Sequence, residues 1–232
     1  MLRVASGELP ETLRLARPGT MIAFSKRDAV SAGFEAAVQA ARDVGFQAVL
    51  RLAGGRAAVF HEHSLELAHA VPGDDPRAGI HPRFARTAGT ISAALGSLGV
   101  DARVGEVPGE YCPGRYSVNA RGRCKLAGLG QRVVAGGSHT GAVIVVDGAE
   151  RVRAALEPVY ESLGLAWDPA TVGAVADELP ATGPADAWAA LRGALVASYS
   201  RRYELVKAEL DAATVDLARR LAGEHALTAQ AT

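Results

Sequence analysis

Apolar positions in the first 148 residues alternate between short runs and a helical spacing. Short apolar runs bounded by glycine, proline or charged residues are typical of strands. They predict strands at residues 20–25, 46–52, 57–60, 65–71, 100–104, 115–120, 124–134 and 138–146. A helical spacing predicts helices at Asp28–Val44 and Phe84–Leu98, and Asp28 is expected to cap the first of them.

Beyond residue 148 the apolar pattern is helical. It predicts helices at Glu150–Leu163, Ala185–Tyr199 and Arg201–Ala222. We therefore expect a catalytic core over residues 1–148 and a C-terminal helical extension, residues 149–232, packed on the same domain. Hairpins mixed with helices predict an α+β fold, with a mixed, largely antiparallel sheet flanked by helices.

Composition and charge narrow the function without naming it. Hydrophobic residues make up 49% of the chain and charged residues 22%, as in a soluble globular protein. The formal net charge is +0, so no global attraction to nucleic acid or to a membrane surface is expected. No run of about 18 apolar residues predicts a membrane span. The first residues lack the apolar segment of a signal peptide, so we expect a cytoplasmic protein.

Both cysteines fall in one glycine-broken stretch, residues 110–132, together with one of the three lysines. A disulfide is not expected in a reducing compartment. A metal site is not expected either, because the nearest histidines, His61, His63 and His139, lack the paired spacing of zinc ligands. Cys124 is interpreted as a small buried apolar residue, the commonest fate of a free cysteine.

Two glycines join the end of one apolar run to the next. Gly54 and Gly55 lie between Arg51 and Arg56, and His61 follows the second run. Glycine lets a ligand approach the backbone closely and exposes the N–H groups to it. The alternative is a β-hairpin or bulge with two solvated arginines. The segment lacks the glycine and lysine spacing of a phosphate-binding P-loop.

Lys125 stands at the head of a long predicted strand that contains Gly128 and Gly130. Strand alternation places Lys125 on the same face as Leu129, and a bulge at either glycine would re-aim Gln131. A lysine in such a place can polarise a carbonyl group or hold a phosphate. The alternative is an ordinary surface lysine, although the chain otherwise strongly prefers arginine.

Cys112 lies in a turn that Pro113 and Gly114 fix. A loop cysteine near basic groups can act as a nucleophile. A glycine-lined pocket, a lysine able to polarise a carbonyl and a thiol nucleophile are together the components of acyl transfer. These components leave the acyl group unnamed.

Two segments carry a resemblance to a known superfamily. The segment LRLAGGRAAVFHE, residues 50–62, resembles the R-R-x-x-G-G-R-A-V-x-H-D signature of the lipoate–protein ligase, biotin ligase and octanoyltransferase superfamily, and KLAGLGQR, residues 125–132, resembles its K-x-x-G-x-x-Q-R segment. The similarity extends from about Thr20 to Asp147. The resemblance implies the biotin/lipoate ligase-like catalytic fold. It also implies that the glycine strand lines the tunnel for the acyl chain, and that Lys125 contacts the acyl carbonyl or an acyl-adenylate phosphate.

A third segment separates the branches of the superfamily. EYCPGRYSV, residues 110–118, resembles the S-Y-C-P-G-x-Y-D-L segment of cysteine-dependent octanoyltransferases and lipoyl amidotransferases. That resemblance implies that Cys112 takes the acyl group as a thioester and passes it to a lysine of a lipoyl domain or of the glycine-cleavage H protein. It implies no required cofactor. The chain departs from the motifs at Leu52, Glu62, Ser117 and the segment His139-Thr140-Gly141.

Two other functions stay open. One is an ATP-dependent lipoate ligase catalytic domain, which would use ATP and Mg²⁺ to form an acyl-adenylate. The other is a non-catalytic binder of an acylated partner. In the favoured interpretation Cys112 and Lys125 are catalytic, and the partners are an octanoyl- or lipoyl-carrying protein and an acceptor domain, with no nucleic acid and no membrane. The expected substrate-binding residues are Arg51, Gly54, Gly55, Arg56, His61, Gly128, Gln131 and His139.

Overall fold

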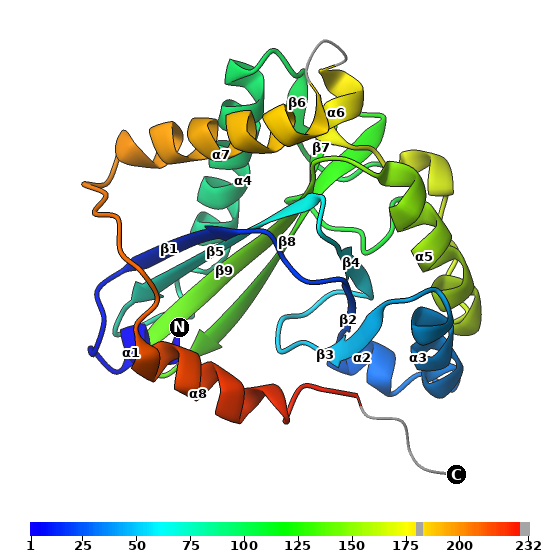
Figure 1. Cartoon of the computed structure of the whole chain (residues 1–232), viewed down its shortest axis with the longest axis horizontal. Coiled ribbons are helices and arrows are strands. Elements are labelled where there is room, and N and C mark those ends of the chain that lie inside the picture. Colours follow the sequence, from blue (N-terminus) through cyan, green and yellow to red (C-terminus); the bar gives the residue numbers. More distant parts are fainter. Residues whose placement is uncertain (180–182, 228–232) are drawn as a thin grey trace.

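The computed structural model of the protein describes residues 1–179 and 183–227, and within them two sheets (Figure 1). The larger sheet is antiparallel at every pairing and has the strand order β1-β5-β9-β8-β7-β6. In the smaller sheet, β3-β2-β4, β2 is parallel to β3 and antiparallel to β4. The strands are β1 Thr12–Ala16, β2 Met21–Phe24, β3 Gln47–Leu50, β4 Ala58–Phe60, β5 Ser64–Pro72, β6 Ala102–Val104, β7 Val118–Ala120, β8 Cys124–Val134 and β9 Gly137–Val145.

Helices cover the two sheets separately, so the molecule has two apolar cores. In the first core, α3 and α5 pack with the smaller sheet, and in the second, α4 and α7 pack with the larger sheet (Figure 1). The helices are α1 Leu2–Ala5, α2 Lys26–Ala29, α3 Phe34–Asp43, α4 Ile80–Ser97, α5 Ala149–Ser162, α6 Val175–Glu178, α7 Pro184–Ser200 and α8 Ala212–Ala222, with a 3₁₀ turn at Pro169–Thr171. The predicted α+β class and the largely antiparallel sheet flanked by helices are confirmed.

The predicted helix Asp28–Val44 is wrong as one element. Ser25 caps α2: its Oγ accepts a hydrogen bond from the backbone N–H of Asp28, and the Asp28 carboxylate accepts one from the N–H of Ser25. Asp28 therefore belongs to a capping box and is not the first cap. The chain breaks before α3 at Gly33, where a Cβ atom would lie only 1.7 Å from the backbone oxygen of Ser162. Glycine is required there because α5 approaches so closely.

The predicted helix Arg201–Ala222 is wrong over its first half. No helix occurs between residue 201 and Asp211, and α8 begins at Ala212. Val206 and Leu210, two members of the predicted apolar stripe, are 84% and 56% exposed. The cap of α8 explains its start, because the Asp211 carboxylate accepts a hydrogen bond from the N–H of Thr214 at 2.7 Å.

The division of the chain at residue 148 stays a prediction. Val152, Leu156 and Val159 of α5 are buried in the same core as the smaller sheet, so α5 packs directly on the elements that precede it. Two short N-terminal elements, α1 and β1, were not predicted. Within the described ranges, 1–179 and 183–227, every helix is too short or too polar to cross a membrane.

Candidate active site

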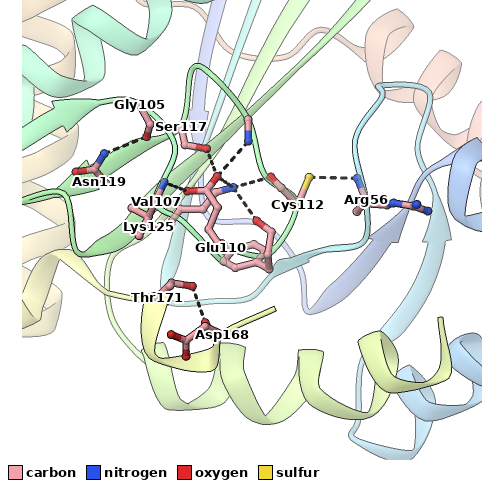
Figure 2. Close-up of polar contacts among 12 residues, drawn as sticks. Arg56, Gly105, Val107, Glu110, Cys112, Ser117, Asn119, Lys125, Asp168 and Thr171 are labelled. Carbon is pink, nitrogen blue, oxygen red and sulfur yellow. Dashed lines mark hydrogen bonds and ion pairs between the residues drawn. The ribbon is translucent and has the colours of Figure 1, made fainter. Parts of the chain in front are cut away.

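Cys112 lies in the loop between β6 and β7, where the two cores meet. Its backbone is left-handed, with a φ of 42°, a conformation that residues other than glycine rarely adopt. Its N–H donates to the hydroxyl of Tyr160 at 2.8 Å, and that hydroxyl donates to the carbonyl of Ala57 at 3.0 Å. Cys112 Sγ accepts a hydrogen bond from the backbone N–H of Arg56 at 3.2 Å, as Figure 2 shows. The loop is thus held so that the sulfur faces the glycine-containing segment, which holds Gly54 and Gly55.

The glycine-containing segment touches the sulfur. A Cβ atom on Gly55, whose φ is 104°, would lie 2.8 Å from Cys112 Sγ and 2.7 Å from Arg51 Nη2. Arg51 Nη2 itself lies 3.6 Å from the sulfur. A Cβ atom on Gly54 would meet nothing within 4 Å, so the space beside that residue is open. Gly55 is therefore needed for the close approach, whereas Gly54 is not.

The two arginines beside the glycines are not simply solvated, so the hairpin alternative is wrong on this point. Arg51 Nη2 donates to the carbonyl of Arg56, and Arg51 Nε is buried with no partner among the described residues. Arg56 Nη1 lies 3.3 Å from the fully buried carboxylate of Asp28. Both guanidinium groups are therefore tied to the protein at the edge of the site.

Lys125 is almost completely buried, with 1% of its surface exposed. Its ammonium donates to Glu110 Oε1 at 2.9 Å, to the carbonyl of Tyr111 at 3.0 Å and to the carbonyl of Cys112 at 2.8 Å. It also lies 4.7 Å from the centre of the Tyr111 ring. An ammonium has three N–H donors, so all of them are used within the protein in this state. The surface-lysine alternative is wrong.

Glu110 is a site residue that the sequence analysis did not identify. Its carboxylate is fully buried, and it accepts from the Lys125 ammonium, the Ser117 hydroxyl at 2.5 Å and the Gly114 N–H at 3.2 Å (Figure 2). Its second oxygen accepts from the Val107 N–H at 3.0 Å. A signal existed in the sequence: residue 110 is glutamate where the resembling motif has serine, and Ser117 stands where it has aspartate.

A bulge in β8 sets the direction of Lys125. Asn119 of β7 pairs with Lys125 and its neighbour Val118 pairs with Ala127, so Leu126 is an extra residue. The predicted bulge at Gly128 or Gly130 is wrong, because β8 pairs regularly with β9 from Ala127 to Val134. The bulge puts Lys125 on the face opposite Ala127, which packs into the second core. The prediction that Lys125 shares a face with Leu129 is therefore wrong.

The glycines of β8 lie on the site face. A Cβ atom on Gly128 would lie 3.3 Å from Lys125 Cε, and one on Gly130 would lie 3.1 Å from the Cβ of Ala53. The segment with Ala53, which precedes the two glycines beside Cys112, thus packs across β8. This contact joins the two motifs that the sequence analysis identified separately.

Three predicted binding residues, Gln131, His61 and His139, form no hydrogen bond with the Cys112 sulfur in the part of the chain that the structure describes. Gln131 donates to the carbonyl of Ile80 and accepts from Arg83, at the start of α4. His61 is buried beside Gly148, and its Nε2 has no partner among the described residues. Burial lowers the pKa of His61 below its usual value. Burial lowers the pKa of His139 to about 4, and the N-terminal amino group and His69 add to this.

The second cysteine is separate from this arrangement. Cys124 is half-buried and packs against the second core, and a Cβ atom on Gly173 would lie 2.5 Å from its sulfur. Burial raises the pKa of the Cys124 thiol. Both cysteines are free thiols. Among residues 1–179 and 183–227, no three His, Cys, Asp or Glu side chains are grouped as a metal site would need.

Solved structures of known proteins share this fold. The crystal structure of lipoate-protein ligase A bound with ATP superposes with a TM-score of 0.72 at 18% identity, over 92% of this chain and 82% of that one. A bi-partite lipoate protein ligase from Thermoplasma acidophilum, described together with its E2 lipoyl domain, gives a TM-score of 0.66 at 18% identity, over 94% and 83% of the two chains. At these identities the likeness shows the fold.

Sequence comparison adds a family. Octanoyl-[GcvH]:protein N-octanoyltransferase of Geobacillus kaustophilus (strain HTA426) is 31% identical over 128 residues, 55% of this chain and 45% of that protein. The chain thus spans about half the length of the curated relatives it matches. The family model for the lipoyl protein ligase A/B catalytic domain matches residues 1–181, and so the resemblance carried by the glycine and lysine segments is confirmed. The chain belongs to the lipoyl protein ligase A/B catalytic domain family.

Proposed function

We propose that the chain is an acyltransferase that moves an octanoyl or lipoyl group from a carrier protein to a protein lysine through a thioester on Cys112. One observation carries the proposal. Cys112 Sγ lies in a shaped loop with a backbone N–H at 3.2 Å and a guanidinium nitrogen at 3.6 Å. Cysteine reacts as a nucleophile through its sulfur, and these donors face the position that the sulfur and its acyl group would occupy. The matched relatives are named octanoyl-[GcvH]:protein N-octanoyltransferase, which supports the same reaction.

The proposed reaction balances without a nucleotide or a metal. The Cys112 thiolate attacks the acyl carbonyl of the donor, the bond to the donor's leaving group breaks, and that group takes up a proton. The neutral amine of the acceptor lysine then attacks the Cys112 thioester. A proton leaves the nitrogen as the amide forms and the C–S bond breaks, and the thiolate is regenerated. The proposed acceptor is a lysine on a lipoyl domain or on the glycine-cleavage H protein.

The charge that develops on the acyl oxygen needs a donor close to the sulfur. The backbone N–H of Arg56 and the Arg51 guanidinium face Sγ, and in the proposed mechanism they serve this role. Lys125 donates to the carbonyl of Cys112 itself, so in this state it holds the nucleophile loop. Direct contact of Lys125 with an acyl oxygen requires the ammonium to exchange one of its three present acceptors.

The test is intact-protein mass spectrometry after incubation with an octanoylated carrier protein and no nucleotide. We expect an octanoyl adduct on the wild type and on Cys124→Ser, and its removal by hydroxylamine, which cleaves thioesters. Cys112→Ser should carry no hydroxylamine-labile adduct. Cys124→Ser is the matched control because that thiol lies outside the site.

The same experiment separates the other two functions. Activity that appears only with free acid, ATP and Mg²⁺, and persists in Cys112→Ala, would replace the proposal with an acyl-adenylate ligase. Tight binding of an acylated partner with no adduct and no transfer, with or without ATP, would replace it with a non-catalytic binder.

A further inference from the structure

The buried ammonium of Lys125 depends on one carboxylate. Among the described residues, Glu110 is the acid within ion-pair distance of Lys125, at 2.9 Å, and the two side chains are 0% and 1% exposed. Removing one partner of a buried ion pair leaves an uncompensated charge, which is strongly unfavourable. Glu110 is therefore the partner that holds the Lys125 ammonium beneath the nucleophile loop.

Glu110 also bridges the two sides of the loop that contains Cys112. Its two carboxylate oxygens accept from the N–H of Val107, on one side of the cysteine, and from the N–H of Gly114, on the other. Lys125, held by the same carboxylate, donates to the carbonyl of Cys112. Cys112 has a φ of 42°, and such a conformation persists only where its surroundings fix it. These contacts, together with the hydrogen bond from the Cys112 N–H to the Tyr160 hydroxyl, are the surroundings that fix it.

The position of this carboxylate differs from the motif that the loop resembles. In S-Y-C-P-G-x-Y-D-L the hydroxyl residue is first and the carboxylate residue eighth. In this chain the first is Glu110 and the eighth is Ser117. The two side chains meet, with the Ser117 hydroxyl donating to Glu110 Oε1 at 2.5 Å. Both orders thus provide one carboxylate and one hydroxyl at two positions that are in contact here.

We propose that Glu110 is the positioning residue that holds Lys125 and the Cys112 loop, and that positions 110 and 117 need one carboxylate and one hydroxyl between them, so that an exchange of the two is tolerated. Glu110 acts through Lys125 and the loop and touches no substrate. The proposal rests on the proposed function only in that Cys112 is taken as the nucleophile. It predicts that two substitutions, each harmful alone, compensate one another when they are combined.

The experiment compares wild type, Glu110→Ser, Ser117→Asp and the double variant Glu110→Ser/Ser117→Asp, all with Cys124→Ser. The first measurement is the rate of alkylation of Cys112 by iodoacetamide as a function of pH, and the second is the rate of octanoyl thioester formation. Misplacing a reacting group by about 1 Å can cost about 10²-fold in rate, so we expect each single variant to lose about tenfold or more. The pH profile of alkylation should shift in both single variants, because Glu110→Ser removes a carboxylate and Ser117→Asp adds a second one.

The double variant should recover both rates to within about threefold of wild type and restore the pH profile, since coupled positions depart from additivity. A double variant no better than the worse single variant would overturn the proposal. Glu106→Ser is the matched control, because Glu106 is an exposed loop glutamate with no hydrogen bond among the described residues. It should leave both rates unchanged.

Two further readouts keep the result interpretable. If Glu110→Ser does not fold, Glu110→Gln is used in its place, because it keeps the shape of the side chain without the charge. Recovery of folding by the double variant then supports the exchange, and a double variant that also fails to fold overturns it.

Alkylation needs no acyl donor. Rescued alkylation without any thioester in the wild type would therefore reject the proposed function and keep this inference. Thioester formation in the wild type without rescue in the double variant would keep the proposed function and reject this inference.

Discussion

At Cys112, the left-handed backbone and the facing glycine, Gly55, together set the position of the sulfur. The loop aims Sγ at the backbone of Arg56, and Gly55 leaves room for the sulfur. A Cβ atom on Gly55 would lie 2.8 Å from Sγ, and the φ of 104° is unfavourable for any L side chain. The position of the Cys112 sulfur thus depends on a residue that contributes no side chain.

Gly55→Ala should therefore impair acyl loading of Cys112 more than it impairs folding. The added methyl group has to displace either the sulfur or Arg51, and a shift of about 1 Å can cost about 10²-fold in rate. Gly54→Ala is the matched control, because its Cβ atom meets nothing within 4 Å. The measurement is the single-turnover rate of thioester formation, together with urea unfolding. Equal loading by Gly55→Ala and wild type would contradict this placement.

At the scale of elements, the sequence predicted the strands better than the polar contacts of the site. The limits of β8, Cys124 and Val134, agree with the prediction, because a long apolar strand ends at glycines and charged residues that the sequence shows directly. The contact of Lys125 with Glu110 was not predicted. It depends on an extra residue in β8 and on a loop closing over it, and neither leaves a periodic signal.

The start of α8 shows the same limit of prediction from apolar spacing. Apolar spacing predicted one helix over Arg201–Ala222, yet Asp211 caps a later start and pairs with Arg3 near the other end of the chain. A cap competes locally with continuation of the helix, because its side chain satisfies N–H groups that would otherwise lack partners. Spacing alone does not show which of the two wins.

Asp211→Ala should loosen α8 without unfolding the molecule. Loss of an N-cap costs about 1 kcal/mol, which corresponds to a change of about fivefold in a local opening equilibrium. No residue of α8 is fully buried, so the helix can open by itself. Hydrogen exchange of the α8 amides should therefore become about fivefold faster, while exchange in β8 and β9 stays the same. Glu209→Ala, at an exposed position before the cap, is the control, and unchanged exchange of α8 in Asp211→Ala would contradict the prediction.

At the scale of the whole molecule, the candidate site takes residues from elements that belong to two different apolar cores. Tyr111 and Cys112 pack against the core of the smaller sheet, whereas Lys125 comes from β8 of the larger sheet. The hydrogen bonds from Lys125 to the carbonyls of Tyr111 and Cys112 therefore cross between the cores. A change in how the cores pack would move the ammonium relative to the sulfur, which couples the chemistry to the stability of the fold.

That stability should fall as the pH falls, partly because of His139. Burial lowers the pKa of His139 to about 4 in the folded protein, whereas an unfolded histidine has a pKa of about 6.5. Between these values the unfolded chain binds more protons than the folded one, so the free energy of unfolding decreases as the pH drops from about 6.5 to about 4. Above about pH 6.5 both states are neutral at this residue and the effect vanishes.

His139→Gln should remove this contribution and make stability less dependent on pH. Burial also lowers the pKa values of His61 and His69, so they act in the same direction and part of the pH dependence should remain. The measurement is urea unfolding of wild type and His139→Gln at about pH 7 and about pH 5. His81→Gln, at an exposed histidine, is the control and should retain the wild-type difference between the two pH values. If His139→Gln loses as much stability on acidification as wild type, burial does not keep His139 neutral in the folded protein.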